Sequence, residues 1–179
     1  DGIDIPLVIN RINDLKKDSK IIAVFSAPLT IQNGKKCSLT DVILEQGRNV
    51  EKGTKATLDT IKSCYKKILE LVNSENKEDC QKTINLFLKK AENALDEALE
   101  KKEFAEEIRS RALAFSGEIL MSHVMNYILR SNGIKTDAVS YDDWPIITDH
   151  NIESTNFLAS KSRENMDKTA KLTLDGKTY

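Results

Sequence analysis

Apolar residues recur every three or four positions along most of the chain, which is the spacing of one helix face. The first stripe predicts a helix that starts at Asp4, a candidate N-cap residue, with Pro6 tolerated in its first turn. We interpret each stripe as core packing and the charged residues between the stripes as solvent-facing. The further helices are predicted over residues 40–46 (with Gly47 as the stop), 54–73, 78–101, 104–115, 118–130 and, more weakly, 152–166.

Short segments without helical spacing lie between and after these helices. Residues 21–25 form a continuous apolar run bounded by polar residues, which predicts a strand buried on both faces. A second short strand is predicted over 134–139, and a hairpin fragment over 171–179, where an Asp-Gly pair indicates the turn. Residues 28–38 are predicted to be a loop that turns at an Asn-Gly pair. A helix followed by a buried strand indicates an α/β sandwich. The segments 54–73 and 78–101 then predict an antiparallel helical pair outside the α/β core.

Composition narrows the class of protein. The 179 residues suit one domain or a large part of one, and 27 basic against 28 acidic residues leave a formal charge of −1. That balance disfavours a nucleic-acid partner or a membrane-surface protein. No apolar run approaches the roughly 18 residues of a membrane helix, and the acidic N-terminus does not indicate secretory export. The widely spaced Cys37, Cys64 and Cys80 favour reduced thiols and a cytoplasmic protein over a zinc site.

Two places carry candidate ligand groups. Glu118 follows Gly117 at a predicted helix start, where the helix end favours an anion and the glycine leaves room for a ligand. A carboxylate fixed there suits an ammonium group, although a first-turn glutamate that only stabilises its own helix fits the same pattern. Ser26 and Ala27 end the predicted strand, where α/β sheets bind ligands, and an ordinary strand-to-loop junction is the alternative.

Other chemistry is sparse. Lys35 and Lys36 either meet a phosphate or lie on a solvated loop, which is where lysine pairs commonly occur. His123 lies within a predicted helix and His150 in a polar stretch, and packing or capping explains both as well as acid–base chemistry does. None of the common nucleotide-binding, zinc-protease or serine-hydrolase motifs is present.

In their order and separation, the end of the predicted strand at Ser26 and Ala27 and the helix start at Glu118 resemble the aspartate kinases of the amino-acid kinase family. The segment IIAVFSA at 21–27 is similar to the family's VVVVSA strand. TDVIL at 40–44 is similar to its T-[ND]-x-L-L helix start, and LAFSGEILMS at 113–122 is similar to its SxGE-x-LS motif. The helix before Gly133, that glycine and KTDAV at 135–139 are similar to its LR..G..A..V stretch, and ITDHN at 147–151 is similar to its TDD-N segment. These five segments follow one another in the family's order.

The resemblance implies a partial three-layer α/β sandwich of the amino-acid kinase type, with a large helical insertion at about 54–107. It implies ATP- and Mg²⁺-dependent phosphorylation of the β-carboxylate of L-aspartate, the first step of lysine, threonine and methionine biosynthesis, by a cytoplasmic homo-oligomer. Carried over to this sequence, the motifs give Glu118 the substrate α-ammonium, Ser26 and Thr40 the substrate carboxylates, and Ala27 a supporting backbone amide. No catalytic residue and no metal ligand is carried over.

Departures from the family pattern limit these expectations. The family's KFGGT strand and GRGGSD loop have no counterpart in the sequence, although the stretch 175–178 resembles the hairpin before that loop. The nucleotide-binding part and the ACT regulatory domains also have no counterpart. We therefore expect residues 1–179 to be the N-terminal, aspartate-binding part of such a kinase, inactive alone. The alternatives are a non-catalytic helical interaction or dimerisation module, or a family member that acts on glutamate, a uridine nucleotide or carbamate.

Overall fold

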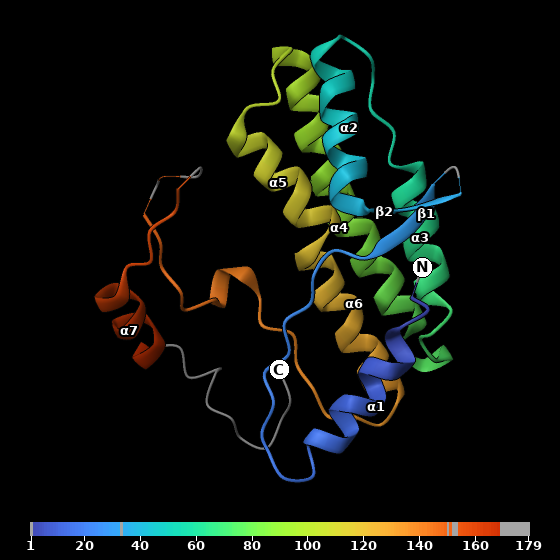
Figure 1. Cartoon of the computed structure of the whole chain (residues 1–179), viewed down its shortest axis with the longest axis vertical. Helices are drawn as coiled ribbons and strands as arrows, with labels where there is room; N and C mark the ends of the chain where they lie inside the picture. Colours follow the sequence, from blue (N-terminus) through green and yellow to red (C-terminus); the bar gives the residue numbers. More distant parts are fainter. Residues whose placement is uncertain (1, 33, 150, 152–153, 169–179) are drawn as a thin grey trace.

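Helices make up most of the molecule, as a computed structural model shows (Figure 1). The structure describes residues 2–32, 34–149, 151 and 154–168. One strand pair lies between the first two helices, and a short 3-10 helix, η1, precedes the last α-helix. In chain order, the elements are α1 (Ile5–Leu15), β1 (Leu29–Gln32), β2 (Lys35–Ser38), α2 (Leu39–Glu51), α3 (Asp59–Leu69), α4 (Ser74–Lys101), α5 (Glu106–Ser116), α6 (Glu118–Ser131), η1 (Tyr141–Asp143) and α7 (Ala159–Lys168).

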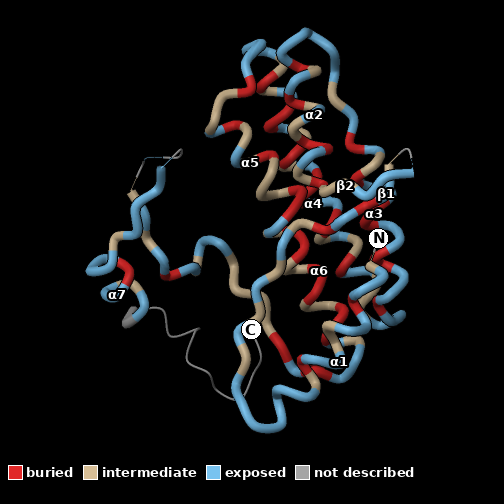
Figure 2. The backbone as a smooth tube through the Cα atoms, viewed as in Figure 1, coloured by how far each residue is buried: buried red, intermediate tan, exposed pale blue. Residues whose placement is uncertain are grey.

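The core is built around the long helix α4. It contacts α2, α3, α5 and α6, so its apolar stripe is enclosed by helices rather than by a sheet. Figure 2 shows the buried positions following these helices. Asn73 caps the start of α4 by accepting a hydrogen bond from the Asn76 amide. The buried residues of α4 are Cys80, Ile84, Phe87, Leu88, Ala91, Ala94, Leu95 and Ala98.

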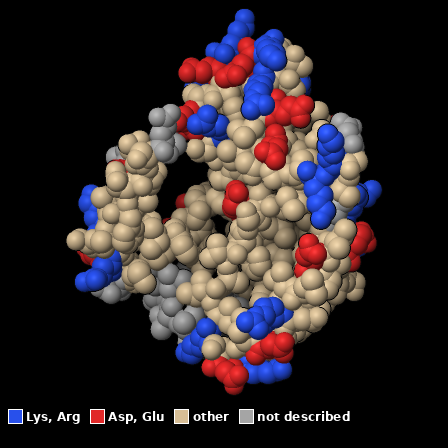
Figure 3. Space-filling view, viewed as in Figure 1, with Lys and Arg blue, Asp and Glu red and all other residues tan. Residues whose placement is uncertain are grey.

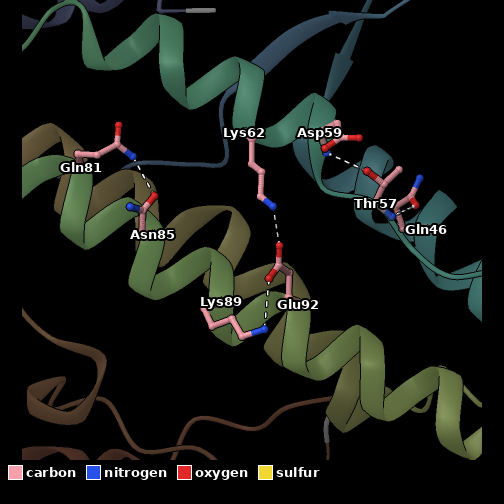
Figure 4. A network of polar contacts seen from close by, with 8 residues as sticks. All are labelled: Gln46, Thr57, Asp59, Lys62, Gln81, Asn85, Lys89 and Glu92. Atoms are coloured by element: carbon pink, nitrogen blue, oxygen red, sulfur yellow. Dashed lines mark hydrogen bonds and ion pairs between the residues drawn. The ribbon is translucent and has the colours of Figure 1, made fainter.

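The antiparallel helical pair predicted over 54–73 and 78–101 is confirmed as α3 and α4. Lys62, early in α3, lies 2.6 Å from Glu92, in the second half of α4 (Figure 4). Glu70, directly after α3, lies 2.9 Å from Lys77, in the first turn of α4. These pairs fix the opposite directions of the two helices. The predicted place of the pair outside the core is wrong, because α4 is the centre of the packing.

The predicted three-layer α/β sandwich is wrong. The sheet of the described residues has two antiparallel strands, β1 and β2, which pair from Leu29 with Ser38 to Gln32 with Lys35. This hairpin occupies the stretch predicted as a loop. Gly34 has the positive φ of +75° that a tight hairpin turn requires, so the Asn-Gly pair indicates the turn between β1 and β2. A layer of parallel strands is missing from the described residues, and the helices therefore pack on one another.

Residues 21–25 belong to no helix or strand, and burial alternates along them. Ile21, Ala23 and Phe25 pack against the helical core, whereas the side chains between them are exposed. Ile22 is 51% exposed and Val24 is 84% exposed. The prediction of a strand buried on both faces is therefore wrong, because burial on both faces requires a neighbouring strand and a second layer that the described residues do not supply. The predicted strand over 134–139 is likewise reduced to one bridge position, at Thr136.

The prediction that Gly47 ends its helix is wrong. The helix α2 continues to Glu51, and the backbone of Gly47 lies against the ring of Phe104. A Cβ atom at residue 47 would be only 2.1 Å from two ring carbons of Phe104. The glycine therefore allows α2 to approach the residue that precedes α5, and its role is close packing rather than helix termination.

The remaining predictions fare unevenly. The first helix is confirmed, but Asp4 adopts a helical conformation and its side chain makes no capping hydrogen bond. The predicted helix over 152–166 is found as α7, displaced towards the C-terminus. The hairpin predicted over 171–179 and the prediction for His150 lie outside the described residues. Among the described residues, every helix is too short or too polar to cross a bilayer.

Candidate functional site

The junction of α5 and α6 lies where the sequence indicated a helix start. Helix α5 ends at Ser116, Gly117 serves as the cap of both helices, and α6 begins at Glu118. The Gly117 amide donates to the Leu113 carbonyl at 2.9 Å, and the Gly117 carbonyl accepts from the Met121 amide at 2.8 Å. The backbone is thus bonded into both helices, which holds the exposed Glu118 side chain at the first position of α6.

Tyr65 of α3 supports this junction from beneath. Its side chain is fully buried, and its hydroxyl lies 3.0 Å from the Ser116 carbonyl and 3.2 Å from the Gly117 carbonyl, to which it donates. Burial, with smaller effects from Cys64 and Glu118, raises the pKa of the Tyr65 hydroxyl well above its ordinary value. The hydroxyl therefore remains a neutral donor. Sequence reasoning placed Tyr65 in an apolar stripe and missed this role.

The extended segment 21–27 meets the same junction. A Cβ atom on Gly117 would lie 3.1 Å from the Ala27 Cβ and 2.9 Å from the Leu113 carbonyl oxygen. This approach needs the absence of a side chain at residue 117. The structure therefore brings together two residues that lie 90 positions apart in the sequence, Ala27 at the end of segment 21–27 and Gly117 at the start of α6.

The start of α2 is joined to the same segment. The Leu39 amide donates to the Pro28 carbonyl at 3.1 Å. This bond holds the first turn of α2, which carries the half-buried Thr40, next to Pro28. Ser38 and Asp41 form a capping box, with the Asp41 amide 3.0 Å from the Ser38 hydroxyl oxygen. The spacing of Ser38 and Asp41 carries that capping signal, which sequence reasoning missed.

A cavity of about 360 Å³ opens beside the junction. Residues 22–25 form one wall, Glu118, Ser122 and Asn126 of α6 form the floor, and residues 136–141 with Trp144 form the other wall. Of the predicted site residues, Glu118 lines this cavity, whereas Ser26, Ala27 and Thr40 do not. Ser26 is exposed next to Ala27, so it borders the junction from the solvent side.

The charge of the cavity is acidic. Glu118 and Asp137 line it, and no lysine or arginine is found among the lining residues that the structure describes. Arg130 lies outside the lining and pairs with Asp137 at 2.6 Å, which leaves the Glu118 carboxylate for a ligand. The buried Oδ1 atom of Asn126 has no hydrogen-bond partner. The cavity therefore suits a cation or a hydrogen-bond donor better than an anion.

Figure 3 shows charged side chains at the top, the bottom and the side edges of this face, and few in its middle. One lysine comes close to the cavity wall from outside. The Lys90 Nζ lies 5.1 Å from the ring centroids of Phe87 and Phe115 and 5.6 Å from that of Tyr141. The ammonium group is held over these rings by cation–π attraction rather than directed into the cavity. Within the described part of the chain, no cluster of His, Cys, Asp and Glu could hold a metal ion.

His123 packs beside this aromatic cluster, 4.9 Å from the Phe87 ring centroid. Burial and, to a smaller degree, the charge of Lys90 lower the pKa of the His123 imidazole from its ordinary 6.5. As pH falls through 6.5, the unfolded chain binds a proton at residue 123 that the folded chain does not. The free energy of unfolding therefore decreases, by at most about 1.4 kcal/mol per pH unit.

We expect His123→Gln to flatten this dependence between pH 7.5 and 5.5, as measured by urea unfolding at several pH values. The variant His150→Gln serves as the control, because it removes the other histidine of the sequence. If the slope persists in His123→Gln and disappears in His150→Gln, the assignment to residue 123 is wrong.

Comparison with protein-family models yields no match for this chain, and comparison with curated proteins yields none either. The function of the site is therefore argued from its residues.

Proposed function

We propose that the chain provides the L-aspartate-binding part of an ATP-dependent aspartate kinase. The contact between Ala27 and Gly117, which joins the two motif segments at the exposed carboxylate of Glu118, is the observation that carries this proposal. The acidic cavity beside that carboxylate supports it, because an α-amino acid brings an ammonium group.

Each predicted residue has a role in the proposed complex. The Glu118 carboxylate accepts charge-assisted hydrogen bonds from the α-ammonium of L-aspartate. The Ser26 and Thr40 hydroxyls, which flank Ala27 and the start of α2, donate to the substrate carboxylates. Tyr65 keeps the carbonyls of the junction bonded, so that the first turn of α6 does not move when the ligand binds.

The described residues do not fit ATP or Mg²⁺. Among the residues that the structure describes, no lysine or arginine lines the cavity and no cluster could hold a metal ion. In the proposed kinase, ATP would supply the phosphoryl group that the β-carboxylate of aspartate accepts. We assign to this chain only the binding and orientation of the acceptor, which is the positioning part of such catalysis.

Neutralising Glu118 tests the proposal. We expect Glu118→Gln to weaken L-aspartate binding roughly tenfold to a hundredfold, because a hydrogen bond to a charged group contributes about 1.5–3 kcal/mol. Calorimetric titration of the chain with L-aspartate measures the change. The matched control is Asp137→Asn, which removes the same charge from the same cavity at a carboxylate that already pairs with Arg130.

An unchanged affinity in Glu118→Gln would remove Glu118 from the amino-acid site. An equal loss in both variants would mean that the general negative charge of the cavity, and not a contact to Glu118, attracts the ligand.

A further inference from the structure

We propose that the cavity beside residues 21–25 binds an extended strand of another polypeptide, with apolar side chains and one basic residue. This interaction surface does not depend on the proposed binding of L-aspartate, and the strand would compete with L-aspartate for Glu118. It follows from the backbone of residues 21–27, from the lining of the cavity and from its charge.

The backbone of residues 21–27 is the first observation. Its amides and carbonyls form no hydrogen bond with any other residue that the structure describes, although burial alternates along the segment as in a strand and three of its side chains pack on the core. Such an edge is a template for another strand, because main-chain pairing satisfies its donors and acceptors. In Figure 1 this segment runs through the middle of the molecule, from the end of α1 to β1.

The cavity lining is the second observation. The cavity follows residues 22–25 on one side and residues 136–141 on the other, with α6 as its floor. A strand laid between these walls would cover apolar side chains that line the cavity, among them Val24, Ile119 and Val139.

The charge of the cavity selects the kind of strand. Glu118 and Asp137 are the charged residues in the described part of its lining, and Arg130 pairs with Asp137. An entering strand with an acidic residue would meet Glu118 with like charge. A strand with one lysine or arginine that reaches Glu118 instead leaves the site balanced, which favours a basic partner.

Hydrogen exchange tests the proposal without L-aspartate. The probe is a synthetic peptide of alternating valine and threonine with one terminal lysine. We expect it to slow the exchange of the amides of residues 21–25 at least tenfold. The same peptide with alternate amides N-methylated is the matched control, because it keeps the side chains and loses the pairing donors. A peptide with glutamate in place of lysine should protect less.

Two variants locate the effect. Val24→Asp places a charge on the 84% exposed Val24, so the fold is retained while the apolar edge is disrupted, and peptide protection should be lost. Leu86→Asp makes the same change at a 58% exposed position of α4 that does not line the cavity, and protection should persist.

Four results would overturn the proposal. The first is no protection by the lysine peptide, and the second is equal protection by the N-methylated peptide. The third is protection in the free chain that rises with protein concentration, because a second copy then occupies the edge. The fourth is protection in the free chain that Leu172→Asp abolishes, because the chain's own C-terminal stretch is then the occupant.

Discussion

Incubated with L-aspartate, Mg²⁺ and ATP, the purified 179-residue chain is expected to form aspartyl phosphate no faster than background. Phosphoryl transfer requires cationic groups and backbone amides around the phosphates. The described residues that line the cavity beside Glu118 include no lysine or arginine, and the ammonium group of Lys90 lies over three aromatic rings. Loss of even one electrostatic partner lowers such rates by about two to three orders of magnitude.

The two lysines noted in the sequence do not supply this charge. Lys35 and Lys36 are exposed on β2, and Lys36 lines a different cavity, together with residues of α1 and β1. The assay traps the acyl phosphate with hydroxylamine and compares the chain with a blank that contains no protein. Hydroxamate formed at roughly 1 per second, an ordinary kinase rate, would show that this chain contains a phosphate site that we have not recognised.

The second large effect concerns the fold. We expect Gly47→Val to lower the free energy of unfolding by about 2–3 kcal/mol, because its side chain would overlap the ring of Phe104. Urea unfolding measures the change. Arg48→Val is the matched control, because it introduces the same side chain at the next, exposed position of α2.

A double-mutant cycle with Phe104→Leu separates packing from backbone effects. A smaller side chain at residue 104 leaves room for the valine, so the cost of Gly47→Val should fall by at least half in that background. Equal costs in both backgrounds would contradict the close contact between Gly47 and Phe104.

The helices were predictable because their apolar stripes are long and regular. The α3–α4 pair follows from such stripes, and the α5–α6 break follows from Gly117. The position of each helix in the molecule was not predictable, because a stripe shows that one face is buried but not against what. This is why the long helix α4 was interpreted as part of an insertion although it is the centre of the core.

The extended segment shows a different limit. An apolar run such as residues 21–25 predicts burial on both faces, and that prediction assumes strands on either side. The described residues provide none, so Val24 is exposed. The apolar run can be identified in the sequence, but its burial depends on neighbouring strands that the run itself does not reveal.

The site was predictable only in part. Glu118 was visible because a glycine precedes it at a helix start, and the structure places it at the cavity. Tyr65 and Asn126 were missed, because an aromatic residue in an apolar stripe and an amide on a helix give no local sign of their targets. The contact of Ala27 with Gly117 depends on tertiary structure, and only the family resemblance suggested that the two segments belong together.

A titration of the ¹⁵N-labelled chain with L-aspartate, followed by NMR, tests the central claim most directly. The claim is that an α-amino acid binds where Ala27 meets Gly117 and Glu118. Succinate is the control ligand, because it has both carboxylates of aspartate and lacks the ammonium group. We predict that aspartate shifts the amide signals of Ala27, Gly117 and Glu118 more than other signals, and that succinate does not. Equal shifts with both ligands, or shifts confined to other parts of the chain, would contradict the account.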